Sequence, residues 1–234
     1  MEKLEEEIRG NILRVKERID RAALRADRNP EEIKLVAVSK SFGLEHIRAA
    51  IAAGITVLGE NRVQEAQQKI PQIEARASWH LVGHLQSNKA KLAAELFDMI
   101  HSIDRVSIAE KLNRHLAALS KRMEVLIQID LVGEETKFGI PEGELEELVQ
   151  RVGEIENLTL IGLMVLPPFF HNPEDVRPYF QRLRQLLNQL NRKRMVSTEL
   201  KELSMGMSHD FEVAIEEGAT MIRLGTAIFG PREE

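Results

Sequence analysis

The chain has 234 residues, of which 43% are hydrophobic and 29% are charged. This composition is ordinary for a globular protein and too apolar for a disordered one. α/β barrels of about 200–250 residues commonly form one unit, so we expect residues 1–234 to be a single domain. The net charge of −5 disfavours nucleic acid and anionic membrane surfaces as partners, and the absence of cysteine excludes disulfides, thiolate nucleophiles and cysteine metal sites.

The first residues, MEKLEEEIRG, are acidic where a secretory signal would have a basic start and an apolar run. No later stretch approaches the ~20 apolar residues that a membrane helix needs. We therefore expect a cytoplasmic protein that does not bind membranes.

Apolar residues at spacings of three and four predict a helix over residues 2–25, with Leu4, Ile8, Ile12, Val15 and Ile19 on its buried face. The run KLVAV predicts a strand over 34–38 that is covered on both sides. A helix over 44–53 and a strand over 55–59 follow. Further strands are expected over 80–82, 99–103, 125–132, 158–166, 203–207 and 221–229, with helical segments between them.

This alternation gives about eight strands, the number that a (β/α)8 TIM barrel requires, and the first helix would be additional to it. A doubly wound open sheet is the main rival. No G-x-G-x-x-G sequence follows the first strand, and no linker divides the chain. The sequence therefore favours the barrel.

Polar residues collect where the strands of such a barrel end, which is where barrel enzymes place their active sites. Ser87, Asn88 and Asp104 are interpreted as caps of the helices that follow. Lys40 comes directly after the first strand, where an apolar wall around its stem would favour a neutral, nucleophilic amine. A lysine that snorkels to solvent at a strand end is, taken alone, an equally good reading.

The last two strands change the balance between these readings. Ser208, Gly225 and Thr226 follow or end them, in the place where barrels commonly bind phosphate through backbone N–H groups. Tight turns and ordinary helix capping would explain the same residues. With Lys40 and Arg223, however, they describe a site for an aldehyde that carries a phosphate.

Several motifs now resemble the pyridoxal phosphate homeostasis proteins, a family similar in fold to the N-terminal barrel of alanine racemase. They are VAVSK at 36–40, GENRVQE at 59–65, WHLVGHLQSNK at 79–89, HSID at 101–104, GLM at 162–164, SMGMSHDFEVAI at 204–215 and RLGTAIFG at 223–230. They span nearly the whole chain in the same order, so the resemblance is specific.

The resemblance implies pyridoxal 5′-phosphate (PLP) as the cofactor, with no metal and no catalytic residue assigned. The implied cofactor-binding residues are Lys40, Asn61, Ser204, Ser208, Arg223, Gly225 and Thr226. Lys40 would form the Schiff base, Arg223 would face the pyridine nitrogen, and Asn61 would line the ring. Ser208, Gly225 and Thr226 would bind the phosphate, with help from Ser204. Lys137 is interpreted as a solvated loop lysine near the rim.

Three functions remain open. The first is a PLP-binding protein for intracellular cofactor homeostasis and delivery, expected to be a monomer, with apo PLP-dependent enzymes as recipients. The second is a racemase-like enzyme acting on amino acids, and the third is a Schiff-base aldolase that uses Lys40 on a sugar phosphate. A charged Arg223 beside the pyridine nitrogen would weaken the cofactor as an electron sink. The only tyrosine, Tyr179, is expected to be a packing residue, and the chain ends directly after the last strand without a second domain to supply another. The first function is therefore preferred, without efficient turnover of amino acids.

Overall fold

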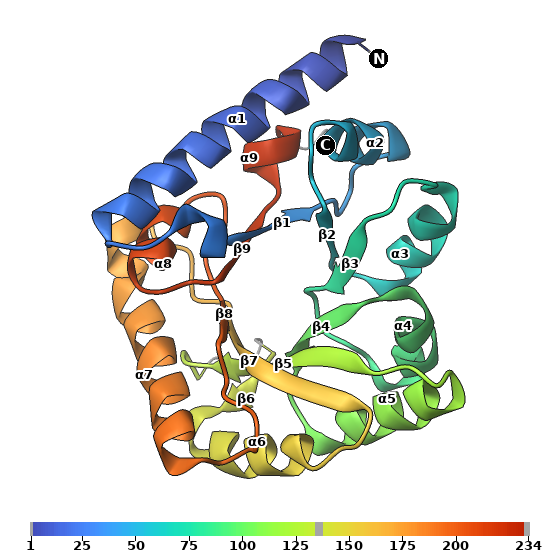
Figure 1. Ribbon diagram of the computed structural model, residues 1–234, viewed down its shortest axis with the longest axis vertical. Coiled ribbons are helices and arrows are strands. Elements are labelled where there is room, and N and C mark those ends of the chain that lie inside the picture. The colour runs from blue at the N-terminus through green and yellow to red at the C-terminus, as the bar shows by residue number, and fades with distance from the viewer. Residues whose placement is uncertain (1, 134–137, 232–234) are drawn as a thin grey trace.

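The computed structural model describes residues 2–133 and 138–231, which form a parallel β-barrel inside a ring of helices (Figure 1). The strands are β1 (Lys34–Val38), β2 (Val57–Glu60), β3 (Ser78–Leu81), β4 (Met99–Ile103), β5 (Met123–Asp130), β6 (Ile140–Pro141), β7 (Leu158–Val165), β8 (Glu202–Ser204) and β9 (Met221–Leu224). The α-helices are α1 (Glu2–Arg25), α2 (Leu44–Ala52), α3 (Val63–Lys69), α4 (Ala90–Leu96), α5 (Val106–Ala118), α6 (Leu145–Gly153), α7 (Arg177–Lys193), α8 (Phe211–Glu216) and α9 (Thr226–Phe229).

The strands pair in parallel in the order β4-β3-β2-β1-β9-β8-β7-β5, and a further pairing of β4 with β5 closes the circle. This closure rules out the open sheet and confirms the predicted eight-stranded (β/α)8 TIM barrel. The two-residue strand β6 pairs with the end of β5 and is additional to the eight. Nothing in the sequence had indicated it.

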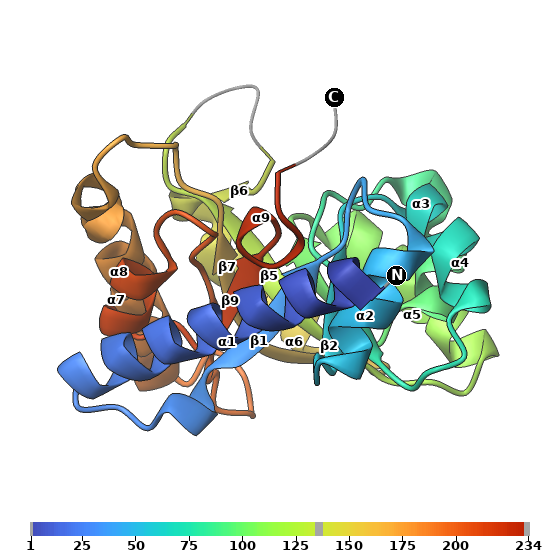
Figure 2. The same ribbon diagram turned by 90° about the horizontal axis from the view of Figure 1, so that it is seen from above.

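The first helix has the predicted bounds, and its apolar face is buried as expected. Figure 2 shows α1 lying across the outside of the barrel, where it packs against α2, α8 and α9. The last two helices, α8 and α9, have only six and four residues, and α1 packs against both of them. Helix α1 therefore covers the side of the barrel where the surrounding helices are shortest. Arg18 of α1 pairs with Glu212 at 2.7 Å and lies over the ring of Phe211.

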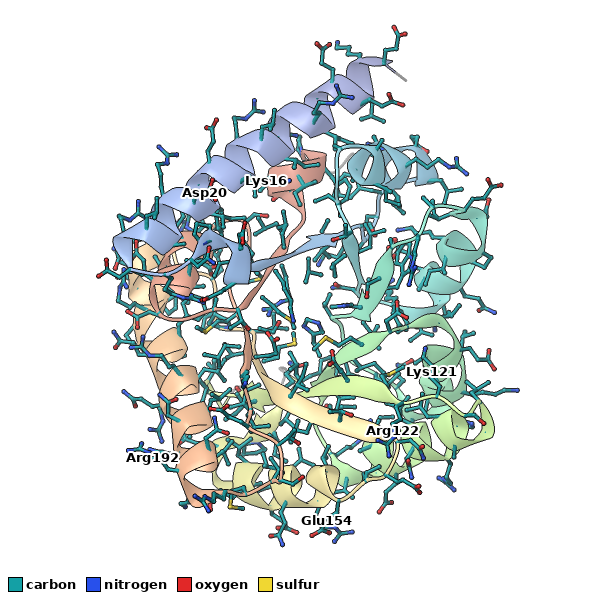
Figure 3. The ribbon with its side chains drawn as sticks, viewed as in Figure 1. Lys16, Asp20, Lys121, Arg122, Glu154 and Arg192 are labelled. Atoms are coloured by element: carbon teal, nitrogen blue, oxygen red, sulfur yellow. The ribbon has the colours of Figure 1, made fainter. Side chains whose placement is uncertain are left out.

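Side chains fill the barrel interior, which looks open when only the ribbon is drawn (Figure 3). One apolar interior cluster consists of Met99, Leu126, Met164 and Met221, and another of Val36, Val38 and Val82. Buried polar side chains are found among the strands as well, and the larger apolar core joins strands and helices. Charged residues such as Asp20, Glu154 and Arg192 lie on the outside of the helical ring in the same view.

The two strand predictions nearest the C-terminus were too long. The strand expected over 203–207 is only Glu202–Ser204, because Gly206 has a φ of +93° and turns the chain. The run expected over 221–229 stops at Leu224, since Gly225 leaves the extended conformation and residues 226–229 form a helical turn. Gly225 and Thr226 therefore lie at the start of α9.

The helix-capping interpretation was also wrong. Ser87 and Asn88 lie inside a 3-10 helix (Ser87–Lys89), and α5 begins after Arg105 without a side-chain cap. The Asp104 carboxylate instead pairs with Arg105, at 2.6 Å, and lies 3.1 Å from His84 Nδ1. Across residues 2–133 and 138–231, no helix is both long and apolar enough to span a membrane.

Candidate functional site

A pocket of about 1030 Å³ lies at the carboxyl ends of the strands. All of the predicted site residues except Ser204 line it: Lys40, Asn61, Ser208, Arg223, Gly225 and Thr226. They come from loops that are far apart in the sequence and that the closed barrel brings together. A second hollow of about 470 Å³, lined by Thr56, Arg76, Ser78 and Asp98 among others, contains none of them.

Arg223 is directed into the barrel by the alternation of side chains along β9, and only 4% of the residue is exposed. Its Nη1 donates to Ser204 Oγ at 2.6 Å, and its Nη2 donates to the Val165 carbonyl at 2.9 Å. Burial lowers the pKa of Arg223 to about 10, against the opposing charge of Asp210. The guanidinium is therefore a fixed cation in the pocket at neutral pH.

Ser204 lies beneath the pocket, fully buried, and does not line it. Its Oγ accepts from Arg223 and is 2.8 Å from His101 Nδ1, while His101 Nε2 is 2.9 Å from His80 Nδ1. Burial lowers the pKa of His80 to about 4 and that of His101 well below its usual value. Both imidazoles are thus neutral at pH 7. This chain of hydrogen bonds holds the Arg223 guanidinium in place. The sequence predicts a different role for Ser204, which is to help bind the phosphate.

The turn between β8 and α8 brings Ser208 to the start of α9. Ser208 Oγ accepts from the backbone N–H groups of Gly225, at 3.3 Å, and Ala227, at 3.2 Å. The positive φ of Gly206 makes this turn, and a Cβ there would lie only 2.6 Å from Ala214 Cβ. Two backbone donors therefore converge on one oxygen, an arrangement that suits an anionic oxygen.

Asn61 enters the pocket from the loop after β2, next to the end of β3. A Cβ on Gly83 would come within 2.1 Å of the Asn61 carbonyl oxygen, so only glycine allows the two loops to approach this closely. Lys40 follows β1 in the turn before α2 and lines the same pocket. Lys137, the other lysine considered near the rim, lies outside the described residues.

Aromatic and histidine side chains at the rim were not among the predicted site residues. Phe138 stacks on His84 with ring centroids 3.9 Å apart, and Phe169 lies 5.0 Å from His209. Phe138 and Phe169 are 56% and 69% exposed, although both line the pocket. Each lies in an irregular loop that follows a predicted strand, and this position is the feature of the sequence that could have identified it as a pocket residue. An aromatic residue in such a loop does not by itself reveal whether its side chain faces the pocket.

The chain matches the family described as alanine racemase, N-terminal domain, over residues 10–233. It is 45% identical over 223 residues to a pyridoxal phosphate homeostasis protein of Aquifex aeolicus, a match that covers 95% of this chain and 97% of that protein. The structure of PipY from Synechococcus elongatus with PLP bound is 37% identical, with a TM-score of 0.81 over 92% of this chain and all of that chain. Alanine racemase of Corynebacterium glutamicum, at 17% identity, has a TM-score of 0.71 over 97% of this chain and 61% of its own. That last likeness concerns the fold alone.

Proposed function

Since the chain belongs to the alanine racemase N-terminal domain family and, within it, is related over nearly its full length to pyridoxal phosphate homeostasis proteins, we propose that it binds PLP for cofactor homeostasis and delivery. The observation that carries the proposal is the meeting of three kinds of group in one pocket. Lys40 provides a primary amine, Arg223 a buried cation, and Ser208, Gly225 and Thr226 a polar turn at the start of α9.

These groups fit PLP. The aldehyde of the cofactor and the Lys40 amine form a C=N bond with loss of one water, and addition of water reverses the step. Ser208, Gly225 and Thr226 would hold the phosphate, while Asn61 would line the ring. Ser204 would act indirectly in this scheme, because it holds Arg223 rather than lining the pocket.

Arg223 favours storage of the cofactor over its use in catalysis. A guanidinium that faces the pyridine nitrogen keeps this nitrogen unprotonated, since Arg223 is itself a cation and has no acceptor. Carbanion chemistry at an amino acid would then depend on well-placed acid and base groups. We therefore propose that the protein does not turn over amino acids efficiently.

Tyr179 does not supply such a group. It lies in α7, partly buried against the main core, with its ring 5.9 Å from that of Phe170, and it does not line the pocket. It is the only tyrosine of the chain. The racemase-like alternative thus has no tyrosine at the site within this chain.

The proposal also covers the location of the protein, its oligomeric state and the recipients of the cofactor. We propose a cytoplasmic monomer that releases PLP to apo PLP-dependent enzymes, either by hydrolysis or by exchange of the Lys40 amine for another. Mixing the PLP-loaded protein with such an apoenzyme, in the presence of an enzyme that consumes free PLP, separates direct transfer from release. Sedimentation of the loaded and unloaded protein tests the oligomeric state.

Two measurements test the proposed function. Addition of PLP to the purified protein is expected to produce the visible absorbance of a C=N bond, and a colourless protein would favour the aldolase reading. Incubation with single L-amino acids in deuterated water is then expected to give little Cα exchange, racemisation or keto acid. Turnover in the ordinary enzyme range, about 1–10³ s⁻¹, would overturn the carrier proposal in favour of a racemase-like enzyme.

A further inference from the structure

The two residues that flank Lys40 are both anchored to the segment comprising β2 and α3. Ser39 donates through its backbone N–H to the Gly59 carbonyl at 2.9 Å and through Oγ to Glu60 Oε1 at 2.6 Å. On the other side of Lys40, the Ser41 backbone N–H donates to Glu65 Oε1 at 2.7 Å. The backbone before and after Lys40 is therefore fixed to the same neighbouring segment.

Lys69, near the end of α3, joins these anchors. Its Nζ donates to the Ser39 carbonyl at 2.8 Å, to Glu60 Oε1 at 2.9 Å and to Glu65 Oε1 at 2.6 Å. An ammonium group has three donors, so all of them are used. We call the group of Ser39, Glu60, Glu65 and Lys69 the Lys69 clamp.

The clamp is buried at its centre. Glu60 is fully buried and Lys69 is only 9% exposed. Burial raises the pKa of Glu60, while the hydrogen bonds from Ser39 and Lys69 oppose this rise. Buried ion pairs of this kind gain little stability over apolar residues of similar size, so stability alone is a weak explanation for the clamp.

A second feature of the loop points to a role at the site. Ser41 has a φ of +68°, in the left-handed region that residues other than glycine rarely adopt. Such a conformation persists where surrounding contacts hold it, and it is found preferentially at functional sites. Here the holding contact is the hydrogen bond from Ser41 to Glu65. None of the four clamp residues is among the described residues that line the pocket.

We propose that the Lys69 clamp is a positioning device, which fixes the backbone on both sides of Lys40 so that its amine is presented to the aldehyde of the bound cofactor. This inference rests on the proposed function, since it assumes that Lys40 forms the covalent bond. The clamp residues act through Lys40 and do not touch the ligand. They determine how readily the C=N bond forms, whereas the rest of the pocket determines how tightly the ligand is held.

Two ligands separate these contributions. PLP carries the aldehyde and reports bond formation by its absorbance, whereas pyridoxine 5′-phosphate carries an alcohol in its place and reports only non-covalent binding. Glu65→Ala removes the acceptor for Ser41, Glu65→Gln keeps an oxygen there, and Gln67→Ala changes an exposed residue of the same helix. Lys69→Met and Lys69→Arg form a second pair at the centre of the clamp.

With Glu65→Ala and Lys69→Met, bond formation is expected to slow by about 10- to 100-fold, because small misplacements of a reacting group have effects of this size. The affinity for pyridoxine 5′-phosphate, measured by calorimetry, is expected to change less than about threefold. Glu65→Gln and Lys69→Arg should restore much of the rate, and Gln67→Ala should behave as the unmodified protein.

Formation of the bond at the unmodified rate in Glu65→Ala would overturn the inference. An equal loss of affinity for both ligands, together with a lower melting temperature, would also overturn it, because the clamp would then be merely structural. If Lys69→Met does not fold, the Glu65→Ala and Glu65→Gln variants alone test the inference. The Glu65 side chain is partly exposed, so we expect these variants to fold. The proposed function would fail separately, if the unmodified protein formed no C=N bond at Lys40.

Discussion

The two halves of the pocket are built in different ways. On the side of β1 and β2, Lys40, which we propose forms the bond, lies between Ser39 and Ser41, and both of these are held by Glu65 and Lys69. On the side of β8 and β9, the proposed binding groups are Ser208, Gly225 and Thr226 at the start of α9, together with Arg223, which a serine and neutral histidines support. The comparison suggests a division of labour in which one half makes and breaks the bond and the other recognises the molecule.

The largest effect is expected from removal of the bond-forming half. Lys40→Ala should abolish the visible absorbance with PLP altogether, because no other amine is expected to take its place. Non-covalent binding should remain, since the recognition half is unchanged. Absorbance and calorimetric titration check both statements, and Lys16→Ala on the distant helix α1 is the control. Retention of the visible band in Lys40→Ala would show that bond formation does not depend on the Lys40 side of the pocket.

Removal of the phosphate should be the next largest effect. Hydrogen bonds to charged groups contribute about 1.5–3 kcal/mol each, so losing about two of them at Ser208, Gly225 and Thr226 predicts a roughly 10²- to 10⁴-fold weaker binding of pyridoxal than of PLP. Ser208→Ala removes one hydroxyl and should weaken PLP binding about 10-fold. Competition against pyridoxine 5′-phosphate measures these affinities. Equal affinity for pyridoxal and PLP would show that the phosphate site is misplaced.

The buried histidines His80 of β3 and His101 of β4, which support Arg223 through Ser204, should make stability depend on pH. Burial lowers the pKa of His80 to about 4 in the folded protein, compared with about 6.5 in the unfolded chain. The unfolded chain therefore binds the proton first, and stability is full above pH 6.5 and falls as the pH drops towards 4. His80 alone corresponds to about 3 kcal/mol over this range. Urea unfolding between pH 4 and pH 7.5 measures the loss.

His80→Gln provides the matched variant for this pH dependence. It removes the titrating group, so the slope of stability against pH should become shallower between pH 4 and 6.5. An unchanged slope would assign the dependence to other residues. His115→Gln, on the outer helix α5, is the control for the histidine-to-glutamine substitution itself.

The smallest effect is expected outside both halves. Arg177 at the start of α7 pairs with Glu174, Glu216 and Glu217 at 2.7–2.8 Å. Because this cluster is partly exposed to solvent, Arg177→Ala should cost only about 1 kcal/mol of stability and leave PLP binding unchanged. A change in the rate of bond formation in this variant would show that the pocket depends on distant ion pairs, which the comparison of the two halves does not include.

The sequence predicts the regular parts of the fold well. The bounds of α1, β1 and β4 agree with the prediction, because a continuous apolar face or a short apolar run marks each of them on its own. The last strand was predicted too long because Ile228 and Phe229 continue the apolar run, although they belong to a helical turn. Hydrophobicity alone does not distinguish the two in so short a segment.

The site residues were predicted only as far as their position after a strand allowed. Lys40, Arg223 and Ser208 line one pocket in the structure, because the carboxyl ends of parallel strands meet in a barrel, and their roles toward the cofactor stay predictions. The support of Arg223 by Ser204 depends on which way each strand faces, which a three-residue strand does not reveal. The spacing of Glu65 and Lys69 indicates an ion pair on a helix, but their contact with the Lys40 loop depends on how β1 and β2 pair.

Peptide mapping after borohydride reduction tests the central claim most directly. The protein is saturated with PLP, reduced, digested and analysed by mass spectrometry, which identifies the lysine that carries the cofactor. The account predicts one cofactor per chain, attached to Lys40. Attachment to Lys89, which also lines the pocket, or to Lys137 in place of Lys40 would contradict it.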